Sequence, residues 1–117
     1  MSNYMLIYLG GDPEWAAKTT PEEMAATMQD WTKWIEALAA KDQLVSGGDP
    51  LNYGGKRVNE EGVVTDIAAS EFKELVSGYS IVKAKNYDEA VDITKTCPIF
   101  SHPGCTVEIR EIMEVDF

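Results

Sequence analysis

Hydrophobic and polar residues follow two different periods along this chain, and the period changes at clear turn signals. The segment Tyr4–Leu9 is continuously apolar and rich in β-prone side chains, and Gly10–Pro13 stops it. A short continuous apolar run of this kind is typical of a strand that is covered on both faces. We therefore expect a central strand at the start of the sheet.

The segment Thr20–Glu23 predicts the start of a helix. Thr20 can cap the helix, Pro21 suits the first helical position, and Glu23 can complete a capping box. Apolar residues then recur at helical spacing up to about Ala40, which places them on one face. The members of this stripe are Met24, Met28, Trp31, Ile35 and Leu38. We expect the stripe to be buried, while Trp34 beside it and Trp15 before the helix could cover a sheet edge or an interface.

Five further elements follow from the same reading. They are a short strand at 44–45 that resumes at 51–53, a hairpin of 56–58 and 63–65, a strand at 79–84, a helix that begins at Asn86–Glu89, and a last strand at 106–115. The second helix should bury Ala90, Ile93 and Cys97 before Pro98 stops it. On the last strand we expect an apolar face of Val107, Ile109, Met113 and Val115. Asp66 should stand where the hairpin's second strand ends.

This order of elements predicts an α+β fold. Two halves, each with a helix that returns across one sheet face, describe a ferredoxin-like split βαβ arrangement with an antiparallel sheet and two helices on one face. The other sheet face then has no helix of its own. Because apolar residues on that face need a cover, we expect a homodimer that packs sheet on sheet.

Composition and charge narrow the classes of function. The 117 residues, 44% of them hydrophobic, suit a single domain spanning 1–117 with its own core. A net charge of −10 disfavours nucleic acid and anionic membranes as partners, and the only adjacent bases are Lys56 and Arg57. No apolar run is long enough to span a membrane, and the N-terminus lacks the features of a secretory signal. We expect a cytoplasmic protein with reduced cysteines.

Cys97, His102 and Cys105 form the only group with metal-like spacing. A structural zinc site needs a fourth ligand, and Cys97 fits the buried face of the second helix, so we predict neither a metal nor a cofactor. A disulfide between the two cysteines is disfavoured in a reducing compartment. A thiolate nucleophile paired with His102 would need a positive environment, which this acidic chain does not offer.

Several short segments, taken in order, resemble the YCII-related family in its DGPF-domain branch. They are Tyr4–Tyr8, the helix through Trp31 and Trp34, Val64–Asp66, the spaced residues Glu71, Lys73, Glu74, Gly78 and Tyr79, Asp88–Ala90, Cys97–Pro98 and Val107–Arg110. The resemblance spans almost the whole chain. It implies a dimeric α+β barrel of ferredoxin-like protomers, a cleft between sheet and helix, and an enzymatic role whose reaction is generally unassigned; some relatives are associated with sigma-factor-like regulators.

The chain departs from that branch at its name-giving motif. Where the branch has Asp-Gly-Pro-Phe, this chain has Asp66-Ile67-Ala68-Ala69, which keeps the acid and loses the turn. The β-branched Ile67 disfavours the positive φ that glycine allows, so the turn must be rebuilt. The YCII-like branch is also thought to pair a histidine with an aspartate, but His102 does not match that histidine's place near the first strand.

Asp66 is the candidate catalytic residue. Burial would raise the pKa of its carboxyl and make it a general acid or base, whereas an acid at a strand end more often caps the next turn. The candidate ligand-binding residues are Lys73, Tyr79, Arg110 and Trp31. Lys73 could instead belong to a solvated face, Arg110 could pair with neighbouring acids, and Tyr79 could pack in the core.

Two classes of function follow. In the first, a small-molecule enzyme or ligand-binding protein has its cleft beside Asp66 under the Trp31 helix, and Arg110 or Lys73 orients an anionic group. In the second, the chain is a non-catalytic interaction or regulatory domain whose function is the dimer, and Asp66 is a turn cap.

Overall fold

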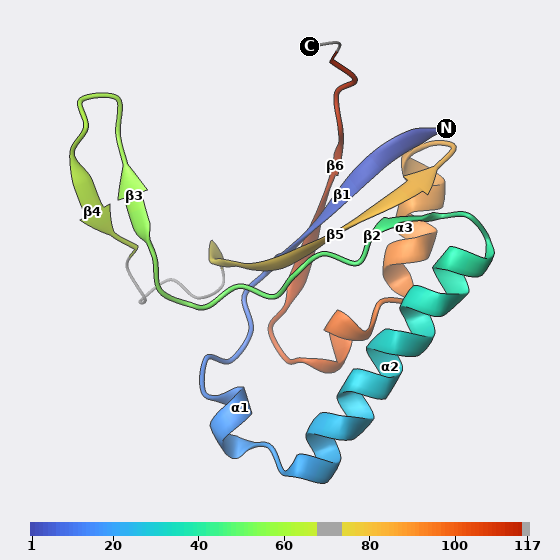
Figure 1. The fold of residues 1–117 in the computed structure, drawn as a ribbon, viewed down its shortest axis with the longest axis horizontal. Helices are drawn as coiled ribbons and strands as arrows, with labels where there is room; N and C mark the ends of the chain where they lie inside the picture. Colours follow the sequence, from blue (N-terminus) through green and yellow to red (C-terminus); the bar gives the residue numbers. More distant parts are fainter. Residues whose placement is uncertain (68–73, 116–117) are drawn as a thin grey trace.

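The computed structural model describes residues 1–67 and 74–115 (Figure 1). The elements are, in chain order, β1 (Ser2–Leu9), α1 (Trp15–Lys18), α2 (Pro21–Ala40), β2 (Leu44–Ser46), β3 (Lys56–Val58), β4 (Val64–Asp66), β5 (Val76–Ala84), α3 (Tyr87–Lys95), the 3-10 helix η2 (Pro98–Ser101) and β6 (Thr106–Glu111). The predicted order of strands and helices is confirmed, and the short helices α1 and η2 are additions to it.

Four strands form one antiparallel sheet in the order β2-β5-β1-β6. Helices α2 and α3 lie on the same side of this sheet (Figure 1). Each helix connects two strands that are separated in the sheet by one other strand, which is the split βαβ pattern. The predicted ferredoxin-like α+β fold is therefore confirmed, with β1 in the central position expected for it.

The two faces of β1 differ in burial. Tyr4, Leu6 and Tyr8 point under the helices and are buried, whereas Met5 and Ile7 point to the open face and are half-buried. The sequence predicted that both faces of this strand are covered. Within one chain, only the face under the helices is fully covered. We call the side of the sheet opposite α2 and α3 the open face.

Helix α2 begins at Pro21, as predicted. The Thr20 hydroxyl accepts a hydrogen bond from the Glu23 backbone N–H at 3.1 Å, and the Glu23 carboxylate accepts one from the Thr20 N–H at 3.4 Å. These two bonds are the predicted capping box. The C-terminal half of α2 contributes Trp34 and Leu38 to the core. The Trp34 indole N–H donates to Thr96 Oγ1 at 2.9 Å.

The apolar stripe predicted on α2 is buried only in part. Leu38 is buried and Trp31 and Ile35 pack against the core, but Met28 is 57% exposed. The side chain that is buried most fully beside Leu38 is Trp34, from outside the stripe. The prediction of a uniformly buried face was wrong because the N-terminal half of α2 extends away from the core.

Three predicted boundaries differ from the structure. Residues 51–53 do not form the predicted strand. Pro50 makes an isolated bridge to Gly78, and the Leu51 N–H donates to the Ser77 carbonyl. Strand β5 begins at Val76, three residues before Tyr79. Strand β6 ends at Glu111, and Met113 and Val115 are exposed instead of facing the core. The expected burial of Ala90, Ile93 and Cys97 is confirmed.

The hairpin β3–β4 is a separate two-stranded sheet. Asp66 is the last residue of β4, as predicted, and it lies opposite Lys56. The hairpin projects away from the four-stranded sheet, on the side opposite α2 (Figure 1). None of the helices in the described ranges combines the length and the apolar character that a membrane crossing requires.

Candidate functional site

A pocket of about 520 Å³ lies beside the N-terminal half of α2. Its walls come from the end of β1 and the connection to α1, from α2 between Met24 and Trp31, from the segment after β2, from the start of β5, and from the connection between η2 and β6. The apolar residues of α2 that leave the core thus form one wall of this pocket.

Aromatic rings meet edge to face in the pocket. The ring centroids of Tyr8 and Trp31 are 5.6 Å apart with the planes at 67°, and those of Trp15 and His102 are 4.9 Å apart at 82°. This geometry is the one that aromatic pairs prefer. The four side chains come from β1, α2, α1 and the loop after η2, so the tertiary fold alone brings them together.

Tyr8 belongs to a buried chain of hydrogen bonds behind the pocket. Its hydroxyl donates to Ser80 Oγ at 2.7 Å, Ser80 donates to the Gly47 carbonyl at 2.8 Å, and the Cys97 thiol donates to the Tyr8 oxygen at 3.6 Å. Burial, reinforced by the neighbouring Cys97, raises the pKa of the Tyr8 phenol. Tyr8 therefore stays neutral and positions the pocket wall.

Two segments of identical sequence, Gly10–Pro13 and Gly47–Pro50, contribute to the pocket. Gly48 has a φ of +72°, and a Cβ there would lie 1.6 Å from the Tyr79 carbonyl oxygen. Only glycine allows this backbone contact. The second segment therefore holds its aspartate, Asp49, against β5, where the Tyr79 hydroxyl donates to its carboxylate at 3.3 Å.

The charged groups that line the described part of the pocket are acidic. Asp12 accepts a hydrogen bond from the Glu14 backbone N–H at 2.9 Å and pairs with Lys18 at 3.4 Å, and these contacts lower the pKa of its carboxyl. Asp49 is the second acid. No lysine or arginine stands among the described residues that line the pocket.

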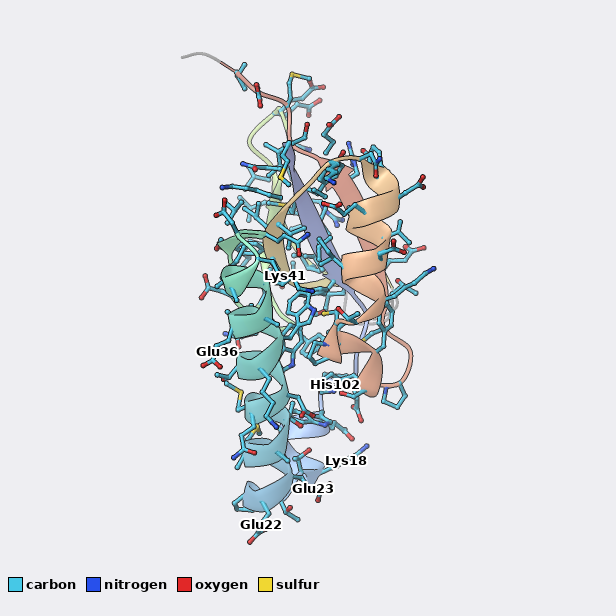
Figure 2. All side chains as sticks on the ribbon, turned by 90° about the vertical axis from the view of Figure 1, so that its right-hand side faces the viewer. Lys18, Glu22, Glu23, Glu36, Lys41 and His102 are labelled. Carbon is cyan, nitrogen blue, oxygen red and sulfur yellow. The ribbon has the colours of Figure 1, made fainter. Side chains whose placement is uncertain are left out.

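His102 and Cys105 line the pocket from the loop that leads into β6. Figure 2 shows His102 on the α2 side of that loop, below α3. Partial burial lowers the pKa of the His102 imidazole and raises the pKa of the Cys105 thiol. Both groups are therefore neutral at pH 7, and a neutral imidazole can accept a proton.

The profile of the YCII-related domain family matches residues 4–116. The chain belongs to the YCII-related family. Among solved structures, it is similar to 5-chloro-2-hydroxyhydroquinone dehydrochlorinase from Burkholderia phenoliruptrix in complex with 2,5-dihydroxybenzoquinone. The identity is 17%, the alignment covers 90% of each chain, and the TM-score is 0.44. No curated protein matches the chain.

Membership of the YCII-related family confirms the resemblance seen in the sequence, and its DGPF branch stays a prediction. Of the site residues predicted by that resemblance and by position, Trp31 and Tyr79 line the pocket. Lys73 lies outside the described residues. The functional roles of all these residues stay predictions.

Asp66 and Arg110 lie elsewhere in this YCII-related chain. The Asp66 side chain is 77% exposed on the hairpin and forms a hydrogen-bonded ion pair with Lys56. Arg110 lies opposite Met5 on the open face of the sheet, whereas the pocket lies on the helix side. The pocket under the Trp31 helix is therefore not beside Asp66 as predicted, because the hairpin that carries Asp66 turns away from α2 (Figure 1), and the catalytic role of Asp66 stays a prediction.

The residues of the metal-like group are divided between two environments. Cys97 is buried and bonded to Tyr8, while His102 and Cys105 line the pocket. Both cysteines are free. Across residues 1–67 and 74–115, no group of three histidine, cysteine or acidic side chains is arranged to hold a metal ion.

Sequence reasoning missed Trp15, His102 and the two aspartates as residues that share a pocket. One signal was available, because Gly-Gly-Asp-Pro occurs twice and follows a strand each time. Each copy read alone is a turn. A repeated turn with an acid at the same position indicates two similar loops at one end of a sheet.

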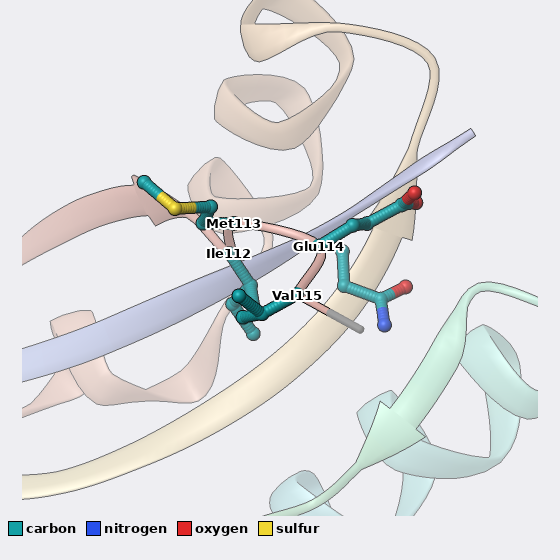
Figure 3. A pocket seen from close by; sticks show the side chains of 5 residues that line it. Ile112, Met113, Glu114 and Val115 are labelled. Atoms are coloured by element: carbon teal, nitrogen blue, oxygen red, sulfur yellow. The ribbon is translucent and has the colours of Figure 1, made fainter. Parts of the chain in front are cut away.

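A second hollow of about 590 Å³ lies where the chain leaves β6 (Figure 3). Asn3 and the segment from Ile112 to Val115 line it. Among its described lining residues, Glu114 is the only one with an ionisable side chain, and none is aromatic. The chemical groups for recognition are therefore concentrated in the pocket beside α2.

Proposed function

We propose that this YCII-related protein binds a small aromatic molecule, neutral or positively charged, in the pocket beside α2. The observation that carries this proposal is the aromatic wall of Tyr8, Trp15, Trp31 and His102 around a space of about 520 Å³. Such a volume suits a ligand of metabolite size, and aromatic walls favour flat apolar groups.

The charge of the ligand follows from the lining. Asp12 and Asp49 are the acidic residues of the lining, the described lining supplies no lysine or arginine, and the chain has a net charge of −10. A cation gains from the carboxylates and from the faces of the tryptophan rings, whereas an anion is repelled. The anionic ligand was expected from Arg110 or Lys73; Arg110 lies on the open face, and Lys73 lies outside the described residues.

His102 would give the pocket a proton acceptor. Its imidazole is neutral near pH 7 because burial lowers its pKa, and its ring is held against Trp15. A bound hydroxyl or ammonium group within reach could donate to it. We therefore assign His102 the role of orienting the polar end of the ligand.

Three indole compounds with the same ring test the proposal. Tryptamine is a cation at pH 7, tryptophol is neutral and indole-3-propionate is an anion. We expect tryptamine to bind most tightly and indole-3-propionate least in a calorimetric titration, with about three- to tenfold between successive compounds. Tighter binding of the anion, or no binding of any of the three at millimolar concentration, would contradict the proposal.

A pair of charge-neutralising variants tests whether the preference for a cation comes from the pocket. Asp49→Asn should bring tryptamine binding close to that of tryptophol, because it removes the negative charge of a residue that lines the pocket. Asp30→Asn removes the same charge from an exposed position on α2 outside the pocket, and should leave the preference unchanged. An equal effect of both variants would mean that overall charge, and not the pocket, selects the ligand.

The catalytic role predicted for Asp66 can be separated from this proposal. Asp66 does not line the pocket, so Asp66→Asn should leave ligand-dependent thermal stabilisation unchanged. Loss of that stabilisation in a folded Asp66→Asn variant would instead support the role that the sequence suggested.

A second proposal concerns assembly, and the open face supports it. Met5, Ile7 and Ile81 are apolar neighbours on this face and are half-buried, and no helix of residues 1–67 and 74–115 packs on them. We propose that two copies pack through this face, as the sequence predicted. Light scattering at low micromolar concentration should give the mass of a dimer, and a monomer would refute the proposal.

A further inference from the structure

We infer that the hairpin β3–β4 is a clasp that holds a second copy of this chain seated on the open face of the sheet. The inference rests on the proposed dimer and goes beyond it, because it assigns a specific role to a part of the chain that lies away from the pocket. Three observations carry it: the shape of the chain, the exposure of the hairpin and its position.

The chain exposes more surface than a monomer of its size. Its accessible area is 8183 Å², against roughly 6,300 Å² for a folded monomer of 12.9 kDa. Its radius of gyration is 15.8 Å, against roughly 13 Å for a compact domain of this length. The excess of roughly 1,900 Å² exceeds the roughly 800 Å² that each partner buries in a standard interface.

The hairpin is part of this exposed surface. All six strand residues of β3 and β4 are exposed. Val58 and Val64 lie opposite each other as a cross-strand apolar pair, 63% and 58% exposed. A two-stranded hairpin is at best marginally stable alone in water, so a surface that covers the valines would stabilise it.

The position of the hairpin indicates which surface that is. It projects on the side of the sheet opposite α2, which is the side of the open face (Figure 1). A second copy seated on the open face lies on that same side. The hairpin and the open face therefore lie on the same side of the molecule, where a single second copy can contact both.

Removal of the hairpin tests the clasp directly. The Ile67 N–H donates to the Gly55 carbonyl at 3.0 Å, so the two ends of the hairpin are adjacent and an Asn-Gly turn can replace residues 56–66. The hairpin is a separate two-stranded sheet and supplies no strand to the four-stranded sheet, so this variant should fold. We expect its dimer Kd to rise about tenfold or more in analytical ultracentrifugation.

A matched pair of point variants gives a second measurement that does not depend on the deletion. Val58→Lys should also weaken the dimer about tenfold, because it buries a charge at the contact. Val91→Lys makes the same change at an exposed valine of α3, on the helix side, and should leave the dimer Kd unchanged. The added lysine lowers the net negative charge, so general repulsion between acidic chains cannot explain a loss.

The outcomes separate this inference from the dimer proposal. A wild-type monomer refutes the dimer and the clasp together. A wild-type dimer whose Kd is unchanged by the deletion and by Val58→Lys refutes the clasp and keeps the sheet-face dimer. A loss that is equal for Val58→Lys and Val91→Lys also refutes the clasp.

Discussion

The two halves of α2 have the same apolar spacing but meet different surroundings. In the C-terminal half, Trp34 and Leu38 are buried in the core with α3 and the sheet. In the N-terminal half, Met24 and Met28 line an open pocket together with Trp31 from the middle of the helix. Helical spacing therefore predicts which side chains share a face, but it does not predict what that face contacts.

The difference also explains why a core residue and a binding residue can look alike in a sequence. Trp31 and Trp34 are one helical turn apart, and their rings meet edge to face at 5.7 Å. Trp34 has its indole N–H satisfied by Thr96 within the protein, while Trp31 is in contact with the pocket. We expect mutations at the two positions to separate stability from binding.

The largest expected effect is that of Trp34→Ala. Loss of a buried tryptophan should lower the free energy of unfolding by about 3–5 kcal/mol, because it leaves a cavity and removes the bond to Thr96. Trp31→Ala should cost less, about 1–3 kcal/mol, and should abolish tryptamine binding. Urea unfolding and calorimetry measure the two effects. Equal losses of stability would show that the pocket wall is part of the core.

A pair of smaller side chains sharpens the comparison along the same helix. Leu38→Ala should lower the free energy of unfolding by about 2–5 kcal/mol, since Leu38 is only 5% exposed. Met28→Ala, at a 57% exposed position of the same stripe, should change it by less than about 0.5 kcal/mol. Both can be measured by urea unfolding, and a Met28 effect as large as that of Leu38 would mean that the pocket is closed in solution.

The smallest effect concerns the titration of His102. It is the only histidine, so one imidazole signal in an NMR titration reports its pKa, which should lie below 6.5. Trp15→Ala should move it back toward 6.5, because the Trp15 ring helps to shield the imidazole from water. Phe100→Ala, at an exposed residue outside the pocket, is the control and should leave the pKa unchanged.

The sign of the pH dependence follows from the lowered pKa. Below 6.5 the unfolded chain binds the proton at His102 more readily than the folded chain does, so protonation favours unfolding. The contribution of His102 to stability is thus fully present above the unfolded pKa, and it is lost as the pH falls through the folded pKa. A His102→Gln variant should lack this component of the acid dependence in thermal unfolding curves.

The elements that were predictable are those with local causes. The cap at Thr20, the Pro21 start and the Asn86 cap of α3 involve atoms within one turn, and all three are present. The hairpin 56–66 is set by its turn and its strand pattern. The end of β6 was not predictable from alternation, because Met113 and Val115 continue the apolar alternation of Val107 and Ile109 although β6 ends at Glu111, opposite Tyr4 of β1.

The candidate site was predictable only in pieces. Trp31 and Tyr79 were recognised by position, but their partners Trp15 and His102 lie far away in the sequence. Asp66 was singled out because it follows a strand and resembles a family motif, and neither feature says which way a hairpin turns. That direction decides whether the acid meets α2 or solvent.

The sequence by itself determined the helix starts and the order of helices and strands along the chain, from which the fold class follows, because these depend on local caps, turns and periodicity. The resemblance to the YCII-related family came from short segments matched in order. Only the tertiary structure decided that half of the apolar stripe on α2 lines a pocket, that both Gly-Gly-Asp-Pro turns meet there, and that the hairpin with Asp66 lies on the opposite side. The physical reason is that burial and contact depend on where distant segments come to lie, and a one-dimensional pattern records only which residues face the same way.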